Sequence, residues 1–202
     1  MLKDNLLLDS TRPFSDAPNK DIGCPEHSSE GVPSSWYALR VSYSRELKVQ
    51  KALDALGVKT FVPMMWKRCQ DNPDRKLVPA VGNLCFAYST RTALEDFIRG
   101  YGESSPVHFY WDRTANRPLT VPDKAMNDFI TVASTLDEDI VYVTEITAKL
   151  REGQTVTVKD GPFKGIEGKV VRIRKSRRIL VELPGMLAVA TTYIDPVNLE
   201  II

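Results

Sequence analysis

The sequence predicts an α+β protein with two domains: an N-terminal α/β sandwich on an antiparallel sheet and a C-terminal β-barrel. Its 202 residues exceed one average domain and suit two small ones. Up to about residue 134, strand-like and helix-like segments follow in the order βαββαβα, which is typical of helices packed on an antiparallel sheet. From residue 150 onward, short alternating segments between Gly and Pro turns predict a small barrel.

Changes in composition along the chain indicate the domain boundaries. The first residues combine prolines with polar and acidic residues and show no apolar period, which is typical of a flexible tail. Acidic residues dominate the stretch between the two domains and favour a solvated linker. We therefore expect an acidic tail at residues 1–33, an N-terminal domain at 34–134, a linker at 135–149 and a barrel domain at 150–202.

Capping and turn residues predict the helices of the N-terminal domain. Ser44 is expected to cap a first helix that ends near Gly57. Thr92, with Glu95 three residues later, has the form of a capping box at the start of a second helix. Pro122 suits the first turn of a third helix. Aromatic and β-branched runs predict strands at residues 36–41, 58–66, 84–88 and 107–111.

The barrel is predicted from period-two alternation of apolar and polar residues. It is clearest at residues 154–159, 169–174 and 179–183, and Gly or Pro turns separate these segments. The same Gly and Pro residues would each weaken a helix, by about 1 and 3 kcal/mol respectively. We therefore expect the barrel to remain β-structured and to leave the surface of the N-terminal domain free.

Composition argues against several classes of protein. No apolar run approaches the roughly 20 residues of a membrane span or forms a signal peptide, so a cytoplasmic location without membrane contact is expected. Cys24, Cys69 and Cys85 are odd in number and widely spaced, and they form neither a disulfide framework nor a CxxC motif. Neither histidine belongs to a catalytic constellation. We expect no enzyme activity, no cofactor and no metal.

The net charge of +1 conceals basic and acidic segments. Residues 34–99 carry eleven Lys or Arg against six Asp or Glu, and residues 151–202 carry nine against six. Residues 1–33 and 100–150 are acidic. Two basic modules therefore alternate with acidic segments, and each basic face is either a phosphate-binding surface or an ordinary solvated one.

A glycine-rich stretch in the barrel resembles the KOW motif of NusG proteins. It reads LREGQTVTVKDGPFKGIEGKVVRIRKSRRILVEL, in which Gly161 follows Asp160 in a tight turn and Phe163 can fill the barrel. The resemblance implies an SH3-like barrel. Its motif residues are Asp160, Gly161, Pro162, Phe163, Gly165 and Gly168.

The N-terminal domain is similar to the NGN domain of the same family, which also begins with a Trp-Tyr strand, here Trp36 and Tyr37. The family segment FPGYVFV, or FPNYLFV in RfaH-type proteins, corresponds to residues 81–87, where Asn83 and Phe86 match but the leading Phe-Pro is replaced. With these departures, the sequence resembles the UpxY-type, RfaH-like antiterminators, which are encoded with capsular polysaccharide operons. The alternatives are a housekeeping NusG or a ribosome-associated KOW protein that binds RNA.

The resemblance implies a monomeric transcription elongation and antitermination factor that binds RNA polymerase through the NGN domain. An apolar, partly exposed surface is needed for this contact, although strand residues of this type are as often core residues. The polymerase-binding candidates are Phe61, Pro63, Trp66, Val81, Asn83, Leu84, Phe86 and Trp111.

Two basic clusters are candidates for nucleic-acid contact, with a solvated face as the alternative for each. The first lies on the initial strand and helix and suits non-template DNA. The second lies on a barrel hairpin and suits nascent RNA, a ribosomal protein or a termination factor. The candidates are Arg40, Arg45, Lys48 and Lys51 in the first cluster, and Arg174, Lys175, Arg177 and Arg178 in the second.

Overall fold

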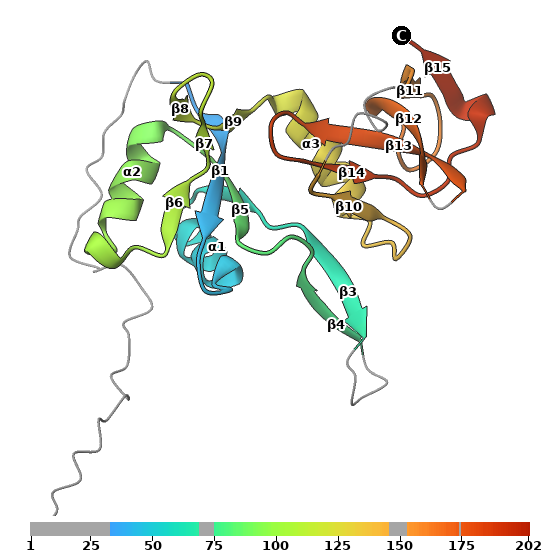
Figure 1. Cartoon of the computed structure of the whole chain (residues 1–202). Coiled ribbons are helices and arrows are strands. Elements are labelled where there is room, and N and C mark those ends of the chain that lie inside the picture. The colour runs from blue at the N-terminus through green and yellow to red at the C-terminus, as the bar shows by residue number, and fades with distance from the viewer. Residues whose placement is uncertain (1–32, 69–74, 146–152, 174) are drawn as a thin grey trace, which may run out of the picture.

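A computed structural model describes residues 33–68, 75–145, 153–173 and 175–202. It confirms the predicted α+β class: an antiparallel sheet with helices on both faces is followed by a barrel-like sheet of short strands. Figure 1 shows the two sheets on either side of helix α3. None of the helices in the described ranges is long and apolar enough to cross a membrane. The expected tail at residues 1–33 lies almost entirely outside the described residues.

The N-terminal sheet is built around its first strand. β1 (Ser35–Val41) lies between β5 (Leu84–Ser89) and β6 (Val107–Phe109), and all of these pairs are antiparallel. β2 (Lys59–Phe61) pairs with β5, and β9 (Thr120–Val121) pairs with β1. β1 and β5 are buried on both faces because helices cover the sheet on each side.

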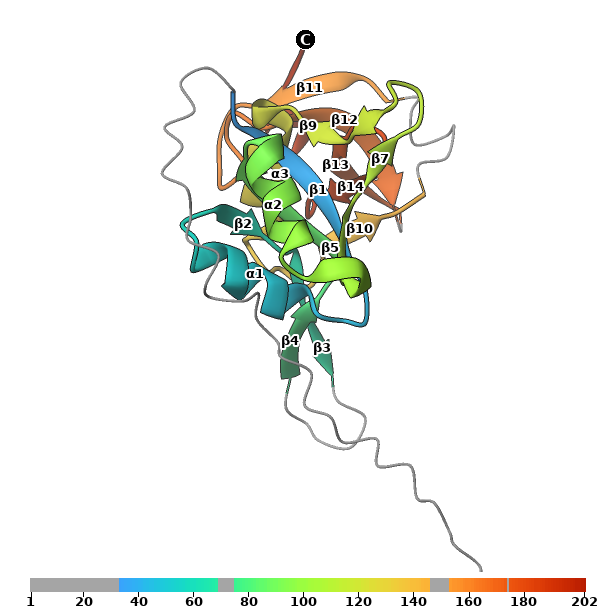
Figure 2. The same cartoon turned by 90° about the vertical axis from the view of Figure 1, so that its left-hand side faces the viewer.

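Helices α1 (Glu46–Asp54) and α2 (Arg91–Arg99) cover one face of this sheet. Figure 2 shows them together in front of it. Ser44 does not cap α1: it has a left-handed φ of 52°, and the helix begins after Arg45 without a side-chain cap. The capping box at Thr92 is also wrong, because Thr90 accepts the bond from the amide of Ala93 at 3.3 Å. In both cases the helix was predicted correctly, but not its first turn.

Two small hairpins extend from the sheet. β3 (Met64–Arg68) pairs with β4 (Arg75–Pro79), and β7 (Trp111–Asp112) pairs with β8 (Arg117–Pro118). A short 3₁₀ helix at Gly102–Ser104 precedes β6. Figures 1 and 2 show the β3–β4 hairpin extending beyond the N-terminal sheet, on the end opposite β7 and β8.

The C-terminal sheet has the strand order β10-β14-β13-β12-β11-β15, with every neighbouring pair antiparallel. β10 (Val141–Val143) lies within the expected linker but pairs with β14, so these three residues belong to the barrel. The 3₁₀ turn Pro196–Asn198 leads into the last strand. The remaining strands are β11 (Thr155–Val158), β12 (Glu167–Ile173), β13 (Ser176–Leu183), β14 (Leu187–Ala190) and β15 (Leu199–Ile201).

Two positions of the KOW-like stretch require glycine for different structural reasons. Gly161 has a φ of +90°, a conformation that L-residues rarely adopt, at the turn after β11. Gly168 lies in β12, where an added Cβ would come within 2.5 Å of the carbonyl oxygen of Leu180 and 2.6 Å of the Ile179 side chain. Backbone approach from β13 therefore requires glycine at position 168.

We predict that Gly168→Ala lowers the free energy of unfolding by about 1–3 kcal/mol, the usual range for overpacking a close-packed site. Gly82→Ala is the matched control, because nothing lies within 4 Å of its added Cβ and its φ is not left-handed. Urea denaturation followed by circular dichroism measures both variants. Equal stability of the two would contradict the steric role assigned to Gly168.

Candidate functional site at the junction of the two domains

Helix α3 (Asp123–Ala133) covers the face of the N-terminal sheet that α1 and α2 leave open. Its Phe129 is fully buried and makes edge-type ring contacts with Phe86 and Phe61, at centroid distances of 5.9 and 6.1 Å. Met126 and Val132 are also fully buried. The helix therefore completes the hydrophobic core on this face of the N-terminal sheet.

The barrel packs on the opposite side of the same helix. α3 contacts both β13 and β14, and Figure 1 shows it between the two sheets. Tyr142 of β10 places its ring 6.4 Å from that of Phe129. One continuous apolar cluster runs from the sheet through α3 into the barrel, where it includes Phe163, Ile166, Ile179, Val181, Leu187 and Val189. The two domains thus share a core.

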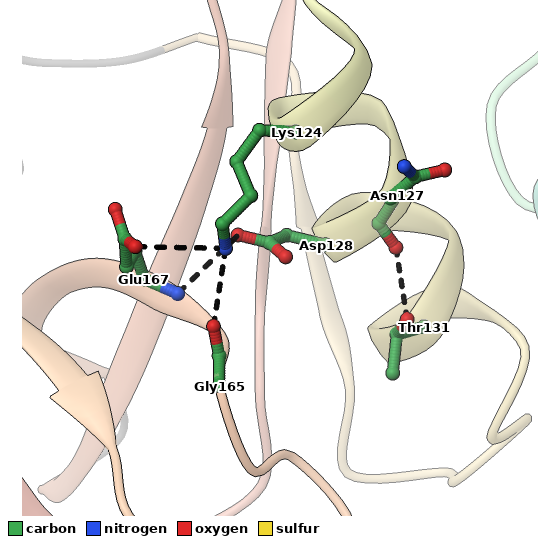
Figure 3. Close-up of polar contacts among 6 residues, drawn as sticks. All are labelled: Lys124, Asn127, Asp128, Thr131, Gly165 and Glu167. Atoms are coloured by element: carbon green, nitrogen blue, oxygen red, sulfur yellow. Dashed lines mark hydrogen bonds and ion pairs between the residues drawn. The ribbon is translucent and has the colours of Figure 1, made fainter.

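A polar cluster borders this core at the start of α3 (Figure 3). The ammonium group of Lys124 donates to the carbonyl oxygen of Gly165 at 3.1 Å and lies 2.6 Å from the carboxylate of Asp128. The backbone amide of Glu167 donates to Asp128 at 3.3 Å, and the Glu167 carboxylate lies 3.7 Å from Lys124. The helix therefore contacts the KOW-like turn through both charge and backbone hydrogen bonds.

A second polar border lies near the end of α3. The guanidinium of Arg178, 6% exposed, donates to the carbonyl oxygens of Asp139 and Thr191, the latter at 2.9 Å. Tyr142 donates its hydroxyl to the carbonyl oxygen of Met64 at 3.3 Å, and burial raises the pKa of this phenol to about 12. Both contacts join the segment after α3 to neighbouring strands.

The residues predicted to bind polymerase do not form one surface, because some are buried and others are exposed. Leu84 and Phe86 are buried, at 1% and 0% exposure, beneath α3. The expectation that the barrel leaves this surface free is wrong, because the barrel closes over the helix that covers it. Pro63 is buried, Asn83 is exposed, and Phe61 and Val81 are partly buried at the edge of the shared core.

Trp66 and Trp111 are exposed, at 41% and 48%, but on different hairpins at opposite ends of the N-terminal domain (Figures 1 and 2). Asn83 has a left-handed φ of 61°, and its backbone N–H donates to the buried Glu46 carboxylate at 2.5 Å. Glu46 was not predicted as important, since an acid in a first helical turn is ordinarily solvated. It fixes the turn that precedes β5.

The first basic cluster lies on the surface, at the end of β1 and along α1. Arg40, Lys48 and Lys51 are exposed, while Arg45 is half-buried. The guanidinium of Arg45 lies 5.5 Å from the ring centre of Tyr43, a residue that is 80% exposed and has a left-handed φ of 63°. This exposed aromatic ring was not among the predicted site residues.

The second basic cluster is only partly available to a ligand. Lys175 and Arg177 are exposed at the β12–β13 turn, and Arg174 lies outside the described residues. Arg178 was predicted to bind nucleic acid, but it is buried and bonded to backbone carbonyls, so it has a structural role here. In the KOW-like stretch Phe163 is buried, as predicted, and Asp160, Gly161, Pro162 and Gly165 form the exposed turn around it.

Comparisons with known proteins agree with this two-part arrangement. Residues 34–130 match the family model described as "Transcription termination factor nusG", and residues 152–182 match the KOW motif. The chain therefore combines a NusG-type N-terminal domain with a KOW motif. A solved structure entitled "Domain interaction in Thermotoga maritima NusG" has 16% sequence identity and a TM-score of 0.45, over 84% of this chain and 97% of that chain. No curated protein matches the sequence.

We predict that Phe129→Ala lowers the free energy of unfolding by about 3–5 kcal/mol, because it leaves a cavity in the shared core. Thr131→Ala on the exposed side of α3 is the control and should change stability by about 0.5 kcal/mol or less. Chemical denaturation, followed separately by signals from each domain, measures both variants. A loss confined to one domain would show that the core is not shared.

Proposed function

We propose that the chain is a transcription elongation and antitermination factor that binds RNA polymerase through the apolar surface of its NGN domain. The observation that carries this proposal is that a NusG match at residues 34–130 is followed by a KOW motif match at residues 152–182. Phe61, which is partly buried at the edge of the shared core, is the aromatic anchor that we propose for this interface.

The polymerase-binding surface that we propose is the part of the NGN domain now covered by the barrel. Release of the barrel would uncover the outer side of α3, and Phe61 and Val81 lie partly buried against the same apolar cluster. Leu84 and Phe86 are buried beneath α3 and pack against the inner side of that helix. Binding therefore requires the barrel to separate from α3, and the docked state is the resting state.

We further propose that the two basic clusters contact nucleic acid during elongation. Arg40, Lys48 and Lys51 on the NGN domain suit the phosphates of non-template DNA. Lys175 and Arg177 on the KOW hairpin suit nascent RNA, and a ribosomal protein or termination factor is the other partner for this domain. The departures from the family pattern at residues 81–87 favour an operon-specific, UpxY-type factor for a capsular polysaccharide operon over a housekeeping NusG.

In vitro transcription through a terminator tests the function. Purified protein is added to RNA polymerase on a capsular operon leader and on an unrelated leader. We expect readthrough on the first template only. Readthrough on both would instead support a housekeeping factor, and no effect on either, combined with tight ribosome binding, would support a ribosome-associated KOW protein.

We predict that Glu167→Lys increases binding to transcription elongation complexes by about two- to five-fold. The substitution replaces the carboxylate next to Lys124 with a like charge and weakens docking by an amount typical of a surface ion pair. Glu200→Lys, at an exposed position of β15, is the matched control and should bind as the wild type does. Co-sedimentation with elongation complexes measures all three proteins, and binding of Glu167→Lys at or below the wild-type level would contradict docking as a restraint.

A further inference from the structure

The turn between β1 and α1 holds an aromatic residue in an unfavourable backbone conformation. Tyr43 and Ser44 have φ angles of 63° and 52°, in the left-handed region that residues other than glycine seldom adopt. A bulky residue such as tyrosine is especially poorly suited to it. Before the turn, the N–H of Ser42 donates to the carbonyl oxygen of Pro106 at 2.8 Å, and after it the chain enters α1. The surrounding fold therefore holds the turn in this conformation.

Burial does not explain why a tyrosine occupies this position. The side chain of Tyr43 is 80% exposed, the highest value among the large hydrophobic residues that the structure describes. Its ring centre lies 5.5 Å from the guanidinium of Arg45, a favourable cation–π contact that leaves most of the ring in solvent. A glycine would remove the strain. The exposed ring therefore has to be accounted for by something other than packing.

Positive charges continue from this ring along the first helix. Arg45 immediately precedes α1, and Lys48 and Lys51 follow at intervals of three residues, a spacing that places side chains next to one another on a helix. Both lysines are exposed. Proteins that bind single-stranded nucleic acid combine such a row of cations with an aromatic ring on which a base stacks. The turn and the helix together supply both parts.

We propose that Tyr43 is a stacking platform for one unpaired base of single-stranded DNA. Arg45, Lys48 and Lys51 lie along the phosphates of the same strand. This inference rests on the proposed contact with non-template DNA and adds recognition of an unpaired base to it. Phosphate contacts exist in a duplex as well as in a single strand. A base stacks on Tyr43 only when it has left its partner strand, so the ring makes this site selective for single strands.

The test measures binding of a labelled DNA single strand of about 12 nucleotides to the full-length protein, by fluorescence anisotropy. Tyr43→Ala should weaken binding by about 5-fold or more, as expected for one lost stacking contact, whereas Tyr43→Phe should stay within about 2-fold of the wild type because its ring still stacks. The control is Tyr193→Ala, which removes a tyrosine that is 60% exposed after β14. Equal losses in Tyr43→Ala and Tyr193→Ala, or an equal loss in Tyr43→Phe, would overturn the proposal.

Two comparisons separate stacking from the phosphate contacts. A duplex of the same sequence should bind Tyr43→Ala and the wild type equally, and a loss as large as that for the single strand would overturn base stacking. Lys48→Ala/Lys51→Ala should reduce the salt slope for the single strand by about 1.4, as for two lost phosphate contacts. If only this slope changes, stacking fails and the phosphate contacts stand. If neither variant has an effect, the proposed contact with non-template DNA fails as well.

The melting temperature tests the strain in the turn. Tyr43→Gly should melt about 2–4 °C above Tyr43→Ala, because both variants lack the ring but only glycine adopts a left-handed φ at little cost. Circular dichroism measures both variants and shows that they are folded. If Tyr43→Gly melts no higher than Tyr43→Ala, the fold does not hold this residue against its backbone preference.

Discussion

Burial of Phe129 between two domains is the interaction on which the rest of the structure depends. Its ring contacts Phe61 and Phe86 of the N-terminal sheet and Tyr142 of the barrel. A fully buried aromatic side chain contributes about 1.5–3 kcal/mol from the area removed from water, and more through specific ring contacts. Because one helix supplies apolar surface to both sheets, neither domain completes its core in this state without α3.

The polar groups around this junction make only weak contacts, so docking of the barrel on α3 can be reversible. Lys124 and Glu167 are both about half exposed, so their attraction is modest and screened by salt. An exposed ion pair contributes about 0–1 kcal/mol, so the buried apolar contact supplies most of the free energy of docking. In the proposed mechanism, a polymerase surface that binds Phe61 and the outer side of α3 displaces the barrel without unfolding it.

The fold was predictable because local signals and burial agree over most of the chain. Period-two alternation and obligatory glycines determine the barrel, and Gly168 has a visible steric reason. The docked arrangement was not predicted, since strand periodicity cannot show which partner covers a face. One signal was available: apolar residues of α3 at positions 125, 126, 129, 130, 132 and 133 cover a wider arc than burial against one sheet requires. Arg178 was assigned to nucleic acid because it belongs to a cluster of basic residues on one hairpin. Its backbone partners, Asp139 and Thr191, are distant in sequence, so the sequence does not show that it is buried.

The central claim is that the two domains form one body in the free protein. Amide ¹⁵N relaxation of the full-length chain tests it most directly, because it measures the rotational correlation time of each domain separately. We expect the same correlation time for amides of β1 and β5 as for amides of β12 and β13, at a value suited to the whole chain. Two shorter and unequal correlation times would show that the domains tumble independently, and would contradict a shared core around Phe129.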